Sequence, residues 1–143
     1  MEKHGTEFYY QTTAITNPPS SLRKSISKFT HSYKHTLLES YSKNKIIQFI
    51  KDWENKQKEK NVLFDFGTEY AIFCAKNKNR IPGKWLFLEV ENELVGYSLS
   101  CPLNKQYWVG IHQKVDYSFK GIGRFLLHHR AMQFEKTPYL TLG

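Results

Sequence analysis

Residues 106–124, QYWVGIHQKVDYSFKGIGR, contain the features that decide the fold. Positions 106–112 are rich in aromatic and β-branched types, which predicts a strand. Gly121 and Gly123 then open an amphipathic segment that predicts a helix of about 14 residues. A strand, a glycine-containing turn and a helix in this order expose backbone N–H groups at the positive end of a helix dipole. The stretch therefore predicts an anion-binding turn.

Upstream of this stretch, hydrophobic periodicity and chain breakers predict an alternation of strands and helices. The expected elements are a strand at 7–15, a basic helix capped by Ser20 or Ser21, a short strand at 35–41, helices at 43–60 and 65–77, and strands at 85–90 and 94–99. The three strands over 85–113 are expected to be consecutive and antiparallel, with the helix from Gly121 packed across them.

Downstream, the helix should turn one face inward and then give way to a last strand at 139–142, after Pro138. The residues expected on the inward face are Ile122, Phe125, Leu126 and Met132. The fold class is therefore α/β (α+β), a mixed sheet flanked by helices in one domain, 1–143. Positions 1–34 supply an N-terminal strand and basic helix, and 35–143 form the core.

The composition favours a folded, basic protein. Apolar residues make up 40% of the chain and aromatic residues 15%, which is too much buriable surface for a disordered chain. Lys and Arg outnumber Asp and Glu by 21 to 13, giving a formal charge of +8. Such a charge attracts phosphate-bearing partners such as coenzyme A, nucleotides or RNA, although a basic solvated surface accounts for it equally well.

The excess of positive charge is concentrated between residues 17 and 36, where no acid occurs. The helix expected there places Leu22, Ile26 and Phe29 on one face. Three cations then lie largely on the other side and are candidate nucleic-acid-binding residues: Arg23, Lys24 and Lys28.

The remaining signals argue against disulfides, metals and membranes. Cys74 and Cys101 lack metal-binding spacing and fit small core residues in a reducing compartment. His128 and His129 are adjacent on a helix, so they point about 100° apart and cannot chelate one ion together. No stretch approaches the ~20 apolar residues of a membrane helix, and no signal peptide is recognisable. A cytoplasmic location is expected.

The element order together with the turn resembles the GNAT acyltransferase superfamily. Its pyrophosphate-binding signature is Gln or Arg, two variable residues, Gly, one residue, then Gly or Ala. Gly121 and Gly123 match this signature, while Ser118 occupies the Gln/Arg position.

A closer resemblance is to the C-terminal domain of phosphatidylglycerol lysyltransferase-like proteins, a group related to enzymes that use aminoacyl-tRNA as donor. Four stretches carry it: EFYY at 7–10, SLRKSISKF at 21–29, IKDW at 50–53, and IHQKVDYSFKG at 111–121. Gln113 departs from the Glu usual there, and such domains continue into a further helix and strands. Without those elements, the strand at 139–142 would be an exposed sheet edge, which predicts a homodimer through it.

The resemblance implies an acyl or aminoacyl transferase acting on an amine or hydroxyl acceptor. The donor would be aminoacyl-tRNA or acetyl-CoA, with no tightly bound cofactor. Two alternatives remain: an inactive GNAT-like module that binds RNA or another acidic partner, and an acetyl-CoA-dependent N-acetyltransferase. The candidate donor-binding residues are Lys114, Lys120, Gly121, Ile122, Gly123 and Arg124.

His112 and Asp116 flank the end of the central strand, where this fold class places its reaction centre, and are the candidate catalytic residues. Histidine has the unperturbed pKa of ~6.5 that suits a general base. Each residue also fits a surface or hydrogen-bonded core role, and the glycines of the turn also fit tight packing of a helix on a strand.

Overall fold

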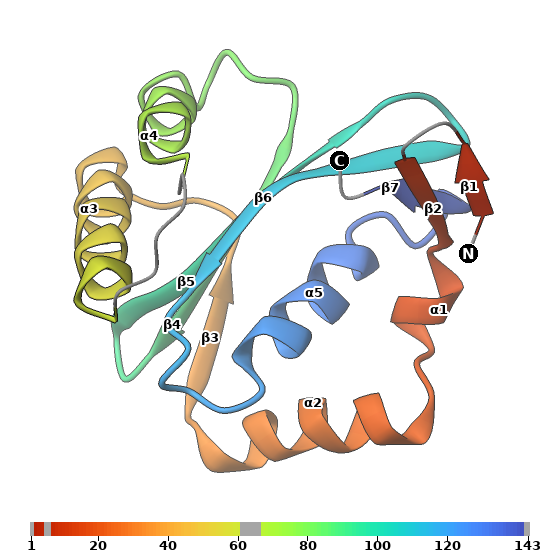
Figure 1. Cartoon of the computed structure of the whole chain (residues 1–143), viewed down its shortest axis with the longest axis horizontal. Coiled ribbons are helices and arrows are strands. Elements are labelled where there is room, and N and C mark those ends of the chain that lie inside the picture. The colour runs from red at the N-terminus through yellow and green to blue at the C-terminus, as the bar shows by residue number, and fades with distance from the viewer. Residues whose placement is uncertain (1, 5–6, 61–66, 142–143) are drawn as a thin grey trace.

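The structure, a computed structural model, describes residues 2–4, 7–60 and 67–141. In this part of the chain, a seven-stranded mixed sheet has the strand order β1-β2-β7-β6-β5-β4-β3 and carries helices on both faces (Figure 1). The elements are β1 (Glu2–His4), β2 (Glu7–Gln11), α1 (Thr13–Thr16), α2 (Ser20–Ser32), β3 (His35–Leu38), α3 (Lys43–Glu59), α4 (Thr68–Lys76), β4 (Lys84–Val90), β5 (Glu93–Pro102), β6 (Tyr107–Val115), α5 (Ile122–Met132) and β7 (Tyr139–Thr141).

The prediction of three consecutive antiparallel strands followed by a helix packed across them is confirmed by β4, β5, β6 and α5. The sheet is buried on both sides, because α2 and α5 cover one face and α3 and α4 cover the other. Strand β4 is accordingly almost continuously apolar and buried, as expected of a strand between two layers.

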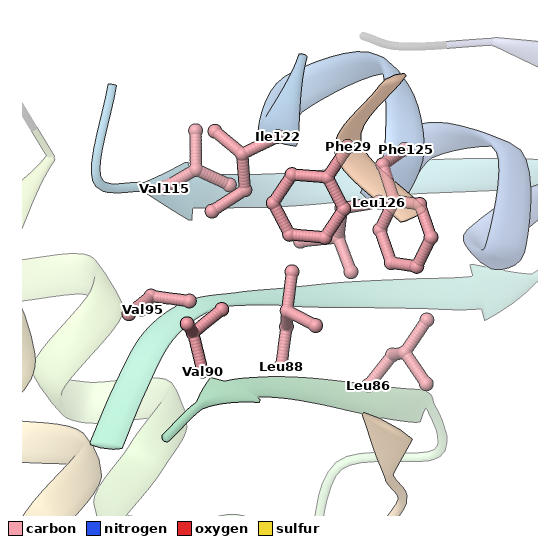
Figure 2. Packing of buried hydrophobic residues seen from close by; sticks show 9 residues of the cluster. All are labelled: Phe29, Leu86, Leu88, Val90, Val95, Val115, Ile122, Phe125 and Leu126. Atoms are coloured by element: carbon pink, nitrogen blue, oxygen red, sulfur yellow. The ribbon is translucent and has the colours of Figure 1, made fainter. Parts of the chain in front are cut away.

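The core under α2 and α5 is built around two rings. Phe29 on α2 and Phe125 on α5 lie with ring centroids 4.4 Å apart, and both contact the aliphatic side chains of the strands below (Figure 2). Ile122 and Leu126 complete the inward face of α5, as predicted. Met132 was predicted to point inward, but this is wrong: it is the last residue of α5 and is exposed, whereas the preceding Ala131 is buried.

The second core lies between the sheet and the α3–α4 layer. Ile46 and Ile50 of α3 are fully buried there against a stack of aromatic side chains on β4 and β5, Trp85, Phe87 and Tyr97. The 4-residue spacing of the two isoleucines places both on one face of α3, which is why the sequence predicted this helix with nearly correct bounds.

Three predicted boundaries need correction. The strand expected at 7–15 ends at Gln11, because Thr12 already has a right-handed helical backbone, with φ −57° and ψ −38°, and α1 begins at Thr13. The N-cap of α2 is Pro19, so Ser20 begins the helix. Helix α4 begins at Thr68 instead of position 65, and positions 65 and 66 lie outside the described residues.

The expectation that the last strand forms a sheet edge is wrong. Strand β2 pairs antiparallel with β7, with Tyr10 opposite Leu140, so β7 is an internal strand between β2 and β6. Thr12 fixes this arrangement, since its N–H donates to Pro138 O at 2.8 Å and its hydroxyl accepts from the indole nitrogen of Trp108 at 3.0 Å. The basis for a homodimer through β7 is thereby removed.

Candidate functional site

Strands β6 and β7 form the parallel pair of the sheet, and they separate early. The pairing runs only from Tyr107 opposite Tyr139 to Val109 opposite Thr141, whereas β6 continues to Val115. Beyond Val109, β6 pairs with β5 alone among the described strands. The carboxyl-terminal part of β6 therefore has a free side directed toward the turn that starts α5, which is where open α/β sheets bind ligands.

A β-bulge marks the point where the two strands separate, and Arg130 of α5 holds it. The pairs of Leu99 with His112 and of Ser100 with Gly110 leave one residue of β6 unpaired between them. The buried guanidinium of Arg130 donates to Ser100 Oγ at 2.6 Å, to Leu99 O at 3.0 Å and to His112 O at 3.3 Å. Burial lowers its pKa to about 10, so it remains charged at neutral pH. The sequence pattern did not predict this role for Arg130.

The two glycines of the turn have different surroundings. Gly121 has φ +82°, and a Cβ on it would lie 2.8 Å from the backbone oxygen of Ser25 in α2. Arg124 adds to this packing by donating to Ser25 Oγ at 3.1 Å. Around Gly123, by contrast, the nearest atom to an added Cβ is Gln113 Nε2 at 4.0 Å. The turn is therefore closed by α2 at Gly121 and open at Gly123.

The free amides of the turn are consequently those at its open side. The N–H of Ile122 bonds Phe119 O at 3.2 Å, and that of Phe125 bonds Gly121 O at 2.9 Å. Among the described residues, the N–H groups of Gly123 and Arg124 have no acceptor. The side chain of Ile122 is buried in the core. Lys120 is exposed beside the turn.

Lys114 does not join these amides. Its side chain lies on the α3 side of β6, nearly buried, with Nζ 4.1 Å from the centre of the Trp53 ring. The neighbouring Gln113 lies on the α5 side, where its amide nitrogen donates to Gly123 O at 3.2 Å. The indole nitrogen of Trp53 donates to Val115 O at 2.8 Å, which ties α3 to the end of β6.

His112 also lies on the α3–α4 side of β6. Its Nε2 is 2.8 Å from the hydroxyl of Tyr97. Burial lowers the pKa of His112 to about 4, and the charges of Lys114 and Arg130 add to the effect. Burial also raises the pKa of Tyr97. Tyr97 is therefore the donor in this bond, and His112 is neutral at physiological pH.

Asp116 follows β6 directly and is held by its neighbours. One carboxylate oxygen accepts from the backbone and the hydroxyl of Ser118, at 3.0 and 2.7 Å, and the other is 3.1 Å from Lys56 Nζ. Partial burial pushes the pKa of Asp116 upward, but the bonds from Ser118 and Lys56 outweigh this and leave it below its ordinary value. No hydrogen bond joins Asp116 to His112.

A cavity of about 390 Å³ opens at this end of β6, and Asp116 forms part of its wall. We call it the strand-end cavity. Its polar wall is mainly acidic, and its other side is aromatic. The acidic residues are Asp52, Glu91, Glu93 and Asp116, beside Lys56, and the aromatic ones are Phe49, Trp53 and Phe119. Sequence reasoning missed it, because its walls come from α3, the β4–β5 turn and the segment before α5.

The predicted nucleic-acid-binding residues, Arg23, Lys24 and Lys28, are exposed on α2, on the side away from Phe29. Their proposed role stays a prediction. In the described part of the chain, no group of three or more His, Cys, Asp or Glu residues is arranged to hold a metal ion. None of the helices found there has the length and apolarity needed to cross a membrane.

No protein-family model and no curated protein matches this sequence. Solved structures do match. One is a conserved protein of unknown function from Bacteroides thetaiotaomicron, 16% identical, with a TM-score of 0.80 over 94% of this chain and 49% of the other. Another is the C-terminal domain of a protein from Agrobacterium fabrum assigned as a lysylphosphatidylglycerol synthetase, 12% identical, with a TM-score of 0.59 over 96% of this chain and 45% of the other.

A third match is a protein from Desulfovibrio desulfuricans assigned to the GNAT acetyltransferases, 10% identical, with a TM-score of 0.54 over 71% of this chain and 68% of the other. The fold is GNAT-like. This confirms the fold that the sequence resemblance implied, and at these identities the likeness concerns the fold alone. The GNAT-like chain spans about half the length of the first two structures.

Proposed function

We propose that this GNAT-like domain is an acyl or aminoacyl transferase in which a cationic amine enters the strand-end cavity. The observation that carries the proposal is the position of that cavity. It opens at Asp116, directly after the strand whose carboxyl-terminal part separates from β7. An acceptor in the cavity and an acyl donor at the turn would meet at the end of β6.

The chemistry of the cavity wall suits a protonated amine. Carboxylates attract the ammonium group, and the ring of Phe49 can contact it by cation–π interaction. Asp116 is ionised at neutral pH because its pKa is lowered, so it adds negative charge to the wall beside its ion pair with Lys56. Lys56 partly offsets the negative charge of the wall through its ion pair with Asp116.

The donor would use the open side of the turn. A phosphate of coenzyme A or of the tRNA acceptor end would accept from the amides of Gly123 and Arg124, with Lys120 as an exposed point charge. In the transfer, the bound ammonium group first loses one proton to water, and the resulting neutral amine attacks the acyl carbonyl carbon. The C–N bond forms, the bond to the leaving oxygen or sulfur breaks, and the amine proton passes to the leaving group.

His112 can take part only as a neutral group. Its low pKa makes it a weak base, and its Nε2 already accepts from Tyr97. A role in positioning β6 fits this environment better than proton abstraction. The same observation favours a second function, an inactive module that binds RNA through the cations of α2, since neither His112 nor Asp116 is then needed as a base.

Two titrations test these functions. Isothermal titration with acetyl-CoA and, separately, salt-dependent binding of lysyl-tRNA identify the donor. Gly123→Val should abolish donor binding by filling the open side of the turn, whereas Met132→Val, an exposed change at the far end of α5, should not. Transfer of an acyl group to spermidine by the parent protein, at a rate that is lower in Asp116→Asn, supports the transferase. Binding of tRNA without acetyl-CoA binding or acyl transfer supports the inactive module.

A further inference from the structure

A second hollow lies at the opposite end of α3 from the strand-end cavity. It has a volume of about 310 Å³ and lies between the first residue of α3 and the turn after α4. We call it the basic pocket, because four cations line it and no carboxylate or aromatic residue of the described chain does. The cations are Lys43, Lys76, Lys78 and Arg80.

The turn after α4 brings these cations together. Asn77 ends the helix, and both its side-chain and its backbone nitrogen donate to Phe73 O, at 2.9 and 3.1 Å. Its own carbonyl then accepts from the N–H of Arg80 at 2.8 Å and of Ile81 at 3.2 Å. The chain therefore folds back tightly, so that the side chains on either side of Asn77 face Lys43 across the hollow.

The cations of the basic pocket have no partner within the described chain. Lys56 and Lys58 on the same α3 helix form ion pairs with Asp116 and Glu54. Among the described residues, no ion pair or hydrogen bond involves the four cationic side chains of the pocket. They are not needed to cap α4 either, because Asn77 already satisfies Phe73 O. Four like charges around one hollow repel each other, and a multivalent anion relieves that repulsion.

We infer that the basic pocket binds phosphate groups of a polyanionic ligand. Arg80 offers a guanidinium fork for two phosphate oxygens, and the lysines add point charges. Because no aromatic ring lines the pocket, it recognises phosphate charge without stacking on a base. The ligand is either the backbone of RNA or a free polyphosphate, and both present the same chemistry.

The basic pocket is distinct from the donor site proposed at the turn. Lys43 and Lys56 are 13 positions apart on one α-helix, which corresponds to about 20 Å at a rise of 1.5 Å per residue. The pocket also contains no residue of the turn at Gly121 and Gly123, so a phosphate bound to the turn does not occupy it. The inference does not rest on the proposed function.

Titration with sodium pyrophosphate, followed by NMR of the backbone amides at low salt, tests the site directly. We expect saturable shifts at Asn77, Lys78 and Arg80, and at least about tenfold weaker binding in K76Q/K78Q. The matched control K105Q/K136Q removes the same charge from exposed positions outside the pocket and should bind as the parent does. Absence of saturable shifts at these amides, or equal weakening in both variants, would overturn the inference.

Binding of a short single-stranded RNA, measured by fluorescence anisotropy over a salt series, identifies the source of the phosphate. If it is an RNA backbone, K76Q/K78Q should reduce the slope of log K against log salt by about 1.4, or 0.7 for each lost contact. K24Q/K28Q separates this from RNA binding by the exposed cations of α2. If RNA neither binds at the pocket nor displaces pyrophosphate from it, the ligand is a free polyphosphate. RNA and pyrophosphate binding that both depend on Lys24 and Lys28 alone would overturn the site.

Discussion

A Cβ atom on Gly121 would lie 2.8 Å from the backbone oxygen of Ser25, so α2 packs against the start of α5 only because this residue is glycine. The left-handed backbone of Gly121, with φ +82°, adds a second reason. Gly123, two residues on, has neither constraint. The two glycines of the turn therefore have different roles. Gly121 allows α2 to pack against α5, and Gly123 leaves the other side of the turn open.

Gly121→Val should therefore destabilise the protein by about 2–4 kcal/mol, from the strained φ and the contact with Ser25. Gly123→Ala should change the free energy of unfolding by no more than about 1 kcal/mol, because its surroundings are open and alanine favours the helix. Urea denaturation followed by circular dichroism measures both. Equal stability of Gly121→Val and the parent would show that α2 does not pack on the turn as described.

The buried histidines predict a loss of stability in acid. Burial lowers the pKa of His112 and of His129 to about 4, against ~6.5 in an unfolded chain. Between these values the unfolded chain binds more protons than the folded one, so stability rises with pH and falls as the pH drops from about 6.5 to 4. In this range, one histidine that stays neutral in the folded chain changes the free energy of unfolding by up to about 1.4 kcal/mol per pH unit. The share of His129 is smaller because it is partly exposed.

His112→Gln should flatten this dependence while keeping an acceptor for the hydroxyl of Tyr97. Urea titrations at a series of pH values between 4 and 7 give the slope for the parent and the variant. An unchanged slope would contradict the assignment of His112 as a buried neutral group.

Arg130→Met should destabilise the protein by about 2–4 kcal/mol. The substitution keeps an apolar stem under α5, but it removes the donors that the bulge carbonyls of Leu99 and His112 use. Ser100→Ala removes only one of the three contacts and should cost about 1 kcal/mol. Thermal unfolding of both variants is the measurement. A smaller effect for Arg130→Met than for Ser100→Ala would remove Arg130 from the role of holding the bulge.

The N-terminal strand should keep β7 from associating with other molecules. A variant that starts at Thr12 lacks β2, so β7 becomes an unpaired edge and should form dimers or larger species as concentration rises. A variant that lacks only residues 1–6 loses β1, which pairs with β2, but keeps β7 covered by β2, so any additional association of the first variant reports the edge of β7. Static light scattering of both over a concentration series tests this, and equal masses at every concentration would count against it.

The local patterns of this sequence were sufficient for most of its elements. The spacing of Ile46 and Ile50 defined α3, and the extended runs before and after position 92 defined β4 and β5. The stretch 106–124 gave β6, the turn and α5 in their observed order. These features depend on neighbours within a few residues, where periodicity and turn chemistry carry the information.

Contacts between distant segments decided the rest. The position of β7 inside the sheet depends on β2, about 130 residues earlier in the chain, and no periodicity reports such a pairing. The same is true of Gly121 against Ser25, of Arg130 against the bulge, and of Lys114 against the Trp53 ring. By itself, the sequence determined which residues are extended, helical or able to turn, because those are local preferences. Only the tertiary structure decided which glycine of the turn stays open and which charges face a cavity, because these depend on which segments pack together.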